Sequence, residues 1–134
     1  MPVSFEATFP ATASGVGAMR RDVAAFAGRA GMSVDGIGDI QLAVSEAGTN
    51  AVIHAYRERT GSLHVRAHVA GPELIVVVGD TGSGLAPRDD SPGLGLGMPL
   101  MASVTSHFHV VSQGAGTEVH MAFTLPGGDG DTLL

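Results

Sequence analysis

Residues 63–78 read Leu-His-Val-Arg-Ala-His-Val-Ala-Gly-Pro-Glu-Leu-Ile-Val-Val-Val, and this stretch decides the fold class. Apolar and polar side chains alternate over residues 63–69, which is typical of an antiparallel strand with one buried face. Gly71 and Pro72 then favour a turn, and the continuous apolar run over residues 74–78 favours a central strand. The stretch therefore predicts two successive strands of a sheet that has a polar outer face.

Helical spacing of apolar residues occurs twice before these strands. Over residues 16–30 the spacing predicts a helix, with Ser14 as its candidate N-cap and Gly31 as the candidate residue just after its C-terminal cap. A second, longer helix is expected to follow Ser33 and to close near residues 60–61. Two helices therefore precede the central strands.

Further strands flank these elements. Alternation over residues 3–9 predicts a first strand, and alternation near residues 108–110 and 119–125 predicts two more. Residues 79–97 are rich in Gly, Asp and Pro, and they predict a long loop of the kind that often closes over a ligand. Residues 98–104 follow this loop as a short predicted helix.

The predicted elements follow one another as β-α-α-β-β-loop-α-β-β. This order favours a two-layer α/β sandwich, in which a mixed, largely antiparallel sheet carries its helices on a single face. A chain of 134 residues is typical of one domain. We therefore expect a single domain over residues 1–134, with a core over residues 3–125 and a frayed tail over residues 126–134.

The composition restricts the possible functions. The chain has seven positive and thirteen negative side chains, for a net charge of −6, and all seven positive ones are Arg. Such an acidic chain is not expected to bind nucleic acid, and the absence of Lys excludes the P-loop and pyridoxal phosphate chemistry. The absence of Cys excludes thiol catalysis and Cys-liganded zinc. No stretch has the pattern of a signal peptide or a membrane span, so we expect a cytoplasmic protein without a membrane partner.

The first candidate site residues are Glu46 and Asn50, which fall on the second predicted helix. Because they are four residues apart, they share one helix face beside the apolar stripe. A carboxylate there can accept a proton from an attacking hydroxyl, and an amide oxygen is a hard ligand that suits Mg²⁺. The pair also fits an ordinary solvated helix face, so both interpretations stay open at this point.

Two glycine-rich motifs supply the other candidates. In Gly79-Asp-Thr-Gly-Ser-Gly84, Asp80 can accept a hydrogen bond from an exocyclic amine while the glycines let a flat ring approach; the alternative is an ordinary turn. In Gly93-Leu-Gly-Leu-Gly97, exposed backbone N–H groups can bind phosphate without a lysine; the alternative is a flexible linker.

The histidines concentrate on the predicted strands. His64 and His68 share one strand face, His107 and His109 share another, and His120 lies opposite the apolar face of its strand. A metal cluster would require these faces to converge, and no carboxylate joins them at ligand spacing. The pattern favours a solvated or interfacial polar face of the sheet.

The order of these motifs, rather than any one of them, resembles the GHKL ATPase superfamily. Within it, the chain is most similar to the bacterial anti-sigma factor serine/threonine kinases. Three segments carry the likeness: Leu-Ala-Val-Ser-Glu-Ala-Gly-Thr-Asn-Ala-Val-Ile-His-Ala-Tyr at 42–56, Asp-Thr-Gly-Ser-Gly-Leu-Ala-Pro at 80–87, and Gly-Leu-Gly-Leu-Gly-Met at 93–98. The resemblance covers residues 3 to about 125 and implies the Bergerat-type ATP-binding fold.

The resemblance also implies a role for each matching residue. Glu46 would act as the general base for the attacking hydroxyl, and Asn50 would hold the Mg²⁺ that bridges the ATP phosphates. Asp80 would accept from the adenine amino group, and Thr117 would support Asp80 and a water near adenine. Five glycines would allow close approach of adenine or contact phosphate through their backbone: Gly82, Gly84, Gly93, Gly95 and Gly97.

The function that the resemblance implies is ATP-dependent phosphorylation of a Ser or Thr in an anti-anti-sigma antagonist, by a protein that otherwise sequesters a sigma factor. The resemblance further implies a homodimer. Two alternatives remain: a non-catalytic ATP-binding switch that only sequesters a partner, and a positive-acting switch kinase of a signalling complex. Glu46 favours an enzyme, because a pure binding protein needs no base.

Overall fold

A computed structural model describes residues 4–55, 61–81, 100–113 and 116–127 of the chain. Its five strands form one sheet in the order β1-β2-β3-β5-β4, and every neighbouring pair is antiparallel. The sheet is therefore wholly antiparallel over the described strands, where a mixed sheet was expected. The strands are β1 (Ser4–Pro10), β2 (Ser62–Ala70), β3 (Glu73–Asp80), β4 (His107–Gln113) and β5 (Gly116–Thr124).

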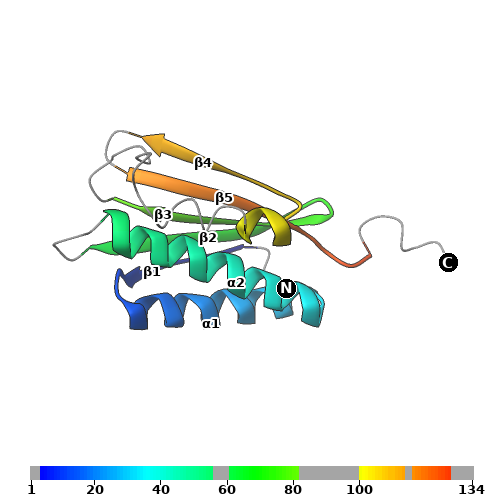
Figure 1. Ribbon diagram of the computed structural model, residues 1–134. Coiled ribbons are helices and arrows are strands. Elements are labelled where there is room, and N and C mark those ends of the chain that lie inside the picture. Colours follow the sequence, from blue (N-terminus) through cyan, green and yellow to red (C-terminus); the bar gives the residue numbers. More distant parts are fainter. Residues whose placement is uncertain (1–3, 56–60, 82–99, 114–115, 128–134) are drawn as a thin grey trace.

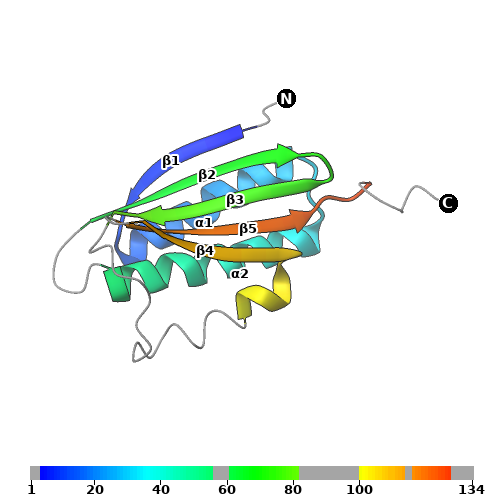
Figure 2. The same ribbon diagram turned by 90° about the horizontal axis from the view of Figure 1, so that it is seen from above.

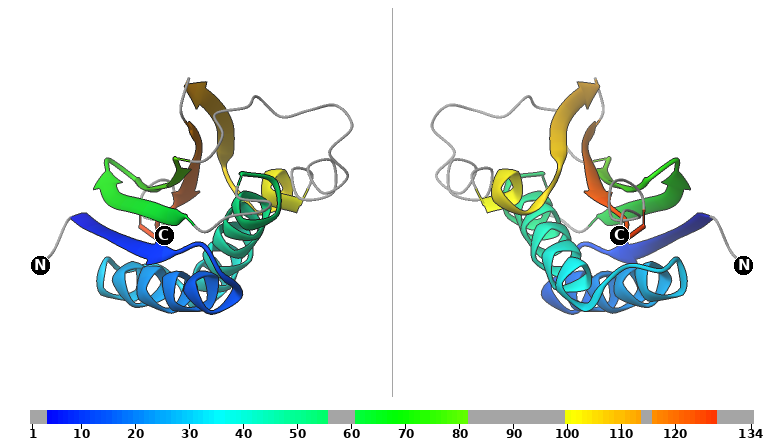
Figure 3. Two further views of the ribbon diagram at one scale, coloured as in Figure 1. Left: turned by 90° about the vertical axis from the view of Figure 1, so that its left-hand side faces the viewer. Right: turned by 90° about the vertical axis from the view of Figure 1, so that its right-hand side faces the viewer.

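Two long helices, α1 (Ala13–Arg29) and α2 (Val34–Asn50), pack side by side on one face of the sheet (Figures 1 and 3). No helix of the described part of the chain covers the opposite face. This arrangement confirms the two-layer α/β sandwich with helices on a single face. The core lies between the layers, and its largest fully buried side chains are Phe26, Met19, Ile40, Leu63, Leu74, Met101 and Met121.

The strands β2 and β3 form where the sequence pattern predicts them. In β2, Leu63, Val65 and Ala67 are buried against the helices. The residues between them are exposed on the outer face, as the alternation indicates. β3 extends through Asp80, so the predicted loop at residues 79–97 begins later than expected. Residues 82–99 lie outside the described part of the chain.

The helix termini are partly as predicted. Gly31, with φ of 99°, follows the cap of α1, and Ser33 caps α2 by accepting a hydrogen bond from the Gly36 amide at 3.0 Å. The N-cap of α1 is Thr12, whose hydroxyl accepts from the Gly15 amide, so the prediction of Ser14 was wrong. The helix starts earlier because its first turn folds back onto the end of β1: a Cβ on Gly15 would overlap a carbonyl oxygen of that strand.

The second helix is shorter than predicted and changes type. The α-helix ends at Asn50, and a π-helical segment, η1 (Ala51–Ala55), continues it. Ala51, the first residue of η1, is still buried, so the spacing of apolar residues did not reveal the change from an α turn to a π turn. Residues 56–60, where the helix was expected to close, are outside the described part of the chain.

The C-terminal elements follow the prediction. Residues 100–104 are helical and lie beside α2 in Figure 2, while residues 98 and 99 of the expected helix are not described. In β5, Met121 and Phe123 are buried against the core, and Leu125 is buried just beyond the strand. Phe108 and Val110 of β4 pair with Met121 and Val119 of β5, which confirms the two expected strands and their apolar faces, although Ala122 on the other face of β5 is buried as well.

Candidate active site at one end of the sheet

Glu46 and Asn50 lie near the C-terminal end of α2. Ala47 is buried between them, whereas Glu46 and Asn50 are themselves half-buried, so both side chains lie at the border of the core. The close packing of α2 against α1 fixes this border. Gly48 makes the packing possible, because a Cβ at this position would approach Val16 of α1 to 3.1 Å.

Asp80 and Thr117 are brought together by the sheet. Asp80 is the last residue of β3, Thr117 is the second residue of β5, and the two are direct partners in the ladder. Asp80 continues the alternation of Val76 and Val78, which are buried on the helix side, so its side chain belongs to that face. Gly116 allows the strands to meet here, because a Cβ on it would overlap the carbonyl oxygen of Asp80.

These two pairs meet at the same end of the molecule. The segment η1, which directly follows Asn50, contacts β3. Figures 1 and 2 both show the C-terminal end of α2 and η1 at the end of the sheet where β3 finishes and β5 begins. The structure therefore gathers a carboxylate and an amide from α2, and a carboxylate and a hydroxyl from the sheet, around one end of the fold.

The glycines of the candidate site cannot be placed. Gly82, Gly84, Gly93, Gly95 and Gly97 all fall within residues 82–99, which lie outside the described part of the chain. Their expected contacts with adenine and phosphate remain predictions.

The donor set fits a magnesium nucleotide. The side chains at this end offer oxygen atoms, which Mg²⁺ prefers as ligands, and Asn50 presents its amide at the half-buried end of α2. Asp80, held by the close approach of Gly116, offers a carboxylate that can accept from an amino group. Because the chain has no Lys, phosphate charge here would be balanced by a cation, by backbone N–H groups or by an Arg side chain.

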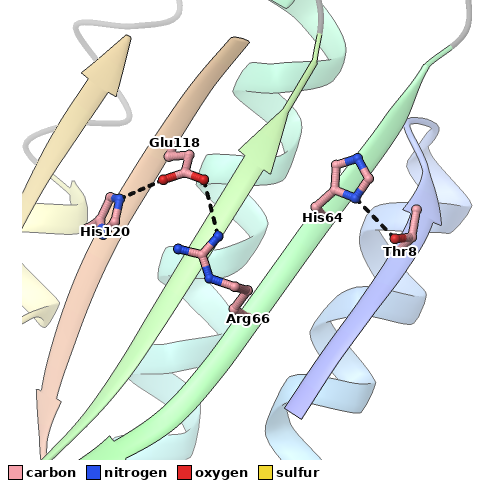
Figure 4. A network of polar contacts seen from close by, with 5 residues as sticks. All are labelled: Thr8, His64, Arg66, Glu118 and His120. Atoms are coloured by element: carbon pink, nitrogen blue, oxygen red, sulfur yellow. Dashed lines mark hydrogen bonds and ion pairs between the residues drawn. The ribbon is translucent and has the colours of Figure 1, made fainter. Parts of the chain in front are cut away.

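The outer face of the sheet carries a polar network that the sequence did not reveal. Glu118 of β5 accepts from the Arg66 guanidinium of β2 at 3.2 Å and forms a hydrogen bond of 2.9 Å with His120 (Figure 4). Burial raises the pKa of Glu118, but the hydrogen bonds and charges of His120 and Arg66 outweigh it and hold that pKa below its ordinary value. The sequence signal was the spacing of Glu118 and His120, which are two residues apart in one strand and therefore share a face. The expectation that no carboxylate joins the histidines was wrong for this pair.

The histidines lie on this outer face, as the sequence predicts. His64 and His68 are exposed on β2, and His109 of β4 stacks on His120 with ring centroids 4.8 Å apart. Within the described residues, no three His, Asp or Glu side chains are grouped as a metal site would require. His64 instead forms a hydrogen bond of 3.1 Å with Thr8 of β1.

A pocket of about 330 Å³ lies at the opposite end of α2. It is open and polar, and it is distant from Glu46 and Asn50, so it takes no part in the candidate site. Its lining comes from the start of α2, residues 103–106 and the end of β5: Met32, Ser33, Asp35, Gly36, Asp39, Ser103, Val104, Thr105, Ser106, Phe123 and Thr124.

Among the described residues, no helix is long and apolar enough to cross a membrane.

Comparisons with known proteins agree with this geometry. Residues 9–123 match the family model described as a histidine kinase-like ATPase domain. The chain is 41% identical over 87 residues to the serine-protein kinase RsbW of Bacillus licheniformis, covering 64% of this chain and 54% of that protein. It is 40% identical over 70 residues to the anti-sigma F factor of Clostridium kluyveri, covering 52% and 49%. These matches span about half the length of both relatives.

A longer match is found with the anti-sigma F factor of Thermoanaerobacter sp., which is 32% identical over 114 residues. The match covers 76% of this chain and 80% of that protein. Among solved structures, the RsbU and RsbW domains of Rv1364c from Mycobacterium tuberculosis superpose with a TM-score of 0.74 at 23% identity, covering 93% of this chain and 33% of that one. At this identity the superposition supports the fold alone.

Proposed function

Since the chain belongs to the histidine kinase-like ATPase domain family, we propose that it is an ATP-dependent serine/threonine-protein kinase that acts as an anti-sigma factor. The names of its relatives support both parts of the proposal, because one is a serine-protein kinase and others are anti-sigma F factors. The observation that carries the proposal is the meeting of the Glu46–Asn50 pair with the Asp80–Thr117 pair at one end of the fold.

Each residue at this end has a proposed task. Asp80 would accept a hydrogen bond from the adenine amino group, and Thr117, its ladder partner, would support Asp80 and a water near adenine. The glycines Gly82, Gly84, Gly93, Gly95 and Gly97 would bring the backbone close to adenine and phosphate. Asn50 would hold Mg²⁺ through its amide oxygen, and the ion would offset the negative charge of the phosphates.

Glu46 acts on the acceptor protein. A carboxylate within hydrogen-bond reach of a Ser or Thr hydroxyl takes its proton as the oxygen attacks the γ-phosphorus. The new bond joins the acceptor oxygen to the γ-phosphorus, the bond from the γ-phosphorus to the bridging oxygen breaks, and ADP leaves with the electron pair. Such a reaction requires mainly positioning and charge stabilisation, so it needs no lysine.

The proposed phosphate acceptor is an anti-anti-sigma antagonist, and the proposed sequestered partner is a sigma factor. With these proposed partners, we also propose a cytoplasmic location. We further propose a homodimer, supported by the outer face of the sheet, which no described helix covers and where Arg66 and the strand histidines offer polar surface to a partner (Figure 3). Light scattering at high protein concentration tests the dimer, and a strict monomer, alone and with the partner, would count against it.

The decisive experiment compares Glu46→Ala with Asn50→Ala. Without its base, Glu46→Ala keeps ATP binding and partner capture, while phosphate incorporation into the antagonist from labelled ATP falls by about 10²–10⁴. Asn50→Ala weakens both binding and transfer, because the phosphate charge is no longer balanced. Equal transfer rates for wild type and Glu46→Ala would remove Glu46 from the mechanism. No transfer by wild type, with tight partner binding, would favour the binding switch instead.

The adenine contact has its own test. Asp80→Asn replaces an acceptor with a group that can present an amide donor to the adenine amine, so ADP affinity should fall by about 1–3 kcal/mol. Isothermal titration calorimetry with ADP measures this change directly. Unchanged affinity would show that Asp80 does not contact the base.

A further inference from the structure

Glu118 links β5 to β2 on the outer face of the sheet. One carboxylate oxygen accepts from the Nη1 of Arg66 at 3.2 Å, and the other lies 2.9 Å from Nε2 of His120. Arg66 belongs to β2 and Glu118 to β5, so their ion pair passes over β3, which lies between them (Figure 4). The carboxylate therefore acts as a clasp that spans β2, β3 and β5.

The Glu118 side chain lies against β3. Gly79 is its ladder partner, and a Cβ at Gly79 would lie 3.4 Å from the Glu118 Cγ, which is an ordinary van der Waals distance. Val77 is only 3% exposed, although it faces away from both helices. Its ladder partners are Arg66 and His120, the two residues that hold the carboxylate.

The carboxylate is partly shielded from water. The side chain of Glu118 is 29% exposed and that of His120 is 26% exposed, whereas Arg66 is 48% exposed. His120 is further held by its stacking on His109 of β4. An ion pair that belongs to a network and loses part of its hydration holds its strands more firmly than an isolated surface pair does.

The clasp lies directly behind the candidate nucleotide site. The Gly79–Glu118 pair is the ladder step next to the Asp80–Thr117 pair, which presents its side chains on the opposite face of the same two strands. This step is close to the end of β3 and the start of β5, where a ladder has few further hydrogen bonds to keep its strands together. Side-chain pairs across strands add to the restraint at such an end of a ladder.

We propose that Glu118 is a positioning residue for the nucleotide site: by joining Arg66 and His120 across β3, it holds Thr117 beside Asp80. The inference rests on the proposed function only for the identity of the ligand. The side chain of Glu118 is on the far face of the sheet and touches no nucleotide. Its effect on the nucleotide passes through the two strands, because a binding residue works only when the elements behind it are fixed.

The test measures ADP affinity by calorimetry for four variants. Glu118→Gln and Arg66→Gln break the clasp from opposite strands, so each should weaken ADP binding about 3- to 10-fold. The double variant should be no weaker than either single one, since both remove the same contact. Arg66→Lys keeps a positive charge opposite the carboxylate and should stay within about twofold of wild type.

Glu73→Gln is the matched control. Glu73 begins β3 at the far end of the strand, where its carboxylate accepts from the Ser106 hydroxyl at 2.9 Å, so its loss removes a similar contact away from the site. Its ADP affinity should equal that of wild type. Amide hydrogen exchange without nucleotide adds a local measurement: in Glu118→Gln the amides of Thr117 and Val119 should exchange faster, while that of Phe123 should not change.

The outcomes separate the two proposals. If wild type binds ADP and Glu118→Gln binds it equally well, or if Glu73→Gln weakens binding as much, the positioning role is refuted and the proposed function stands. If wild type does not bind ADP, the proposed function fails and the positioning role with it. Should Glu118→Gln fail to fold, Arg66→Gln tests the same contact from a more exposed side chain.

Discussion

Gly48 is the position where the contact between α1 and α2 is closest, and replacing it by Ala tests how tightly the helix with Glu46 and Asn50 is held. A Cβ on Gly48 would lie 2.8 Å from the Met19 Cε and 3.1 Å from a methyl of Val16. Carbon atoms in contact prefer a separation of about 3.5–4.0 Å, so the new methyl would lie too close to these two side chains by roughly half an ångström to one ångström.

The magnitude follows from two opposing terms. Any Gly→Ala change in a helix interior adds about 1 kcal/mol of stability from helix propensity. Extra volume in a packed core costs about 1–3 kcal/mol, because the Met19 methyl and the Val16 methyl must both move. The free energy of unfolding of Gly48→Ala should therefore be equal to that of wild type or lower by about 1–2 kcal/mol.

Gly38 provides the matched control on the same helix. A Cβ on Gly38 would meet no atom within 4 Å, so Gly38→Ala gains the propensity term alone and should be about 1 kcal/mol more stable than wild type. Urea unfolding of both variants measures the difference, which should be about 1–3 kcal/mol. Phosphate transfer should fall in Gly48→Ala only, because the displaced helix carries the base. If Gly48→Ala gains as much stability as Gly38→Ala, the two helices are not closely packed at this point.

Three further outcomes are expected. Thr12→Ala should lower the free energy of unfolding by about 1 kcal/mol and Ser14→Ala by much less, because Thr12 caps α1; equal losses in urea unfolding would contradict this N-cap. Gly116→Ala should abolish ADP binding measured by calorimetry, because its methyl overlaps the Asp80 carbonyl; normal binding would show that the strands can part here. The pKa of Glu118 is lowered in the folded protein, so its contribution to stability is complete above the ordinary Glu pKa and is lost as pH falls through the folded pKa. The free energy of unfolding of Glu118→Gln should therefore depend less on pH in that acidic range than that of wild type. If the two pH profiles run parallel, the lowered pKa is contradicted.

The sequence predicted those parts of the fold that depend on local patterns. The alternation around Arg66 assigns the successive side chains of β2 to opposite faces of the sheet, and this assignment does not depend on which strands β2 pairs with. Ser33 caps α2 through a contact three residues away, which a local pattern also contains. The cap of α1 was missed because Thr12 and Ser14 are both suitable hydroxyls, and the choice depends on the packing of Gly15 against the end of β1.

The sequence predicted some relations between the residues of the candidate site and not others. Glu46 and Asn50 are on one helix face by spacing alone, but their placement at the same end as Asp80 depends on the order of strands in the sheet, which no local pattern contains. The sequence supplied that pairing only through the order of the motifs and their resemblance to a family. The contact between Glu118 and Arg66 could not be predicted, because it joins residues 52 positions apart in the chain.

The pairing of β1 with β2 also has a consequence for how the chain folds. Pro10 is paired with Ser62 and Ser4 with His68, so this part of the sheet closes only after both helices have been synthesised. The hairpin of β2 and β3 needs only the short turn at Gly71, and closing a short loop costs less entropy than closing a long one. We therefore expect the β2–β3 hairpin to form early and β1 to dock late, as the slow long-range step in assembling the sheet.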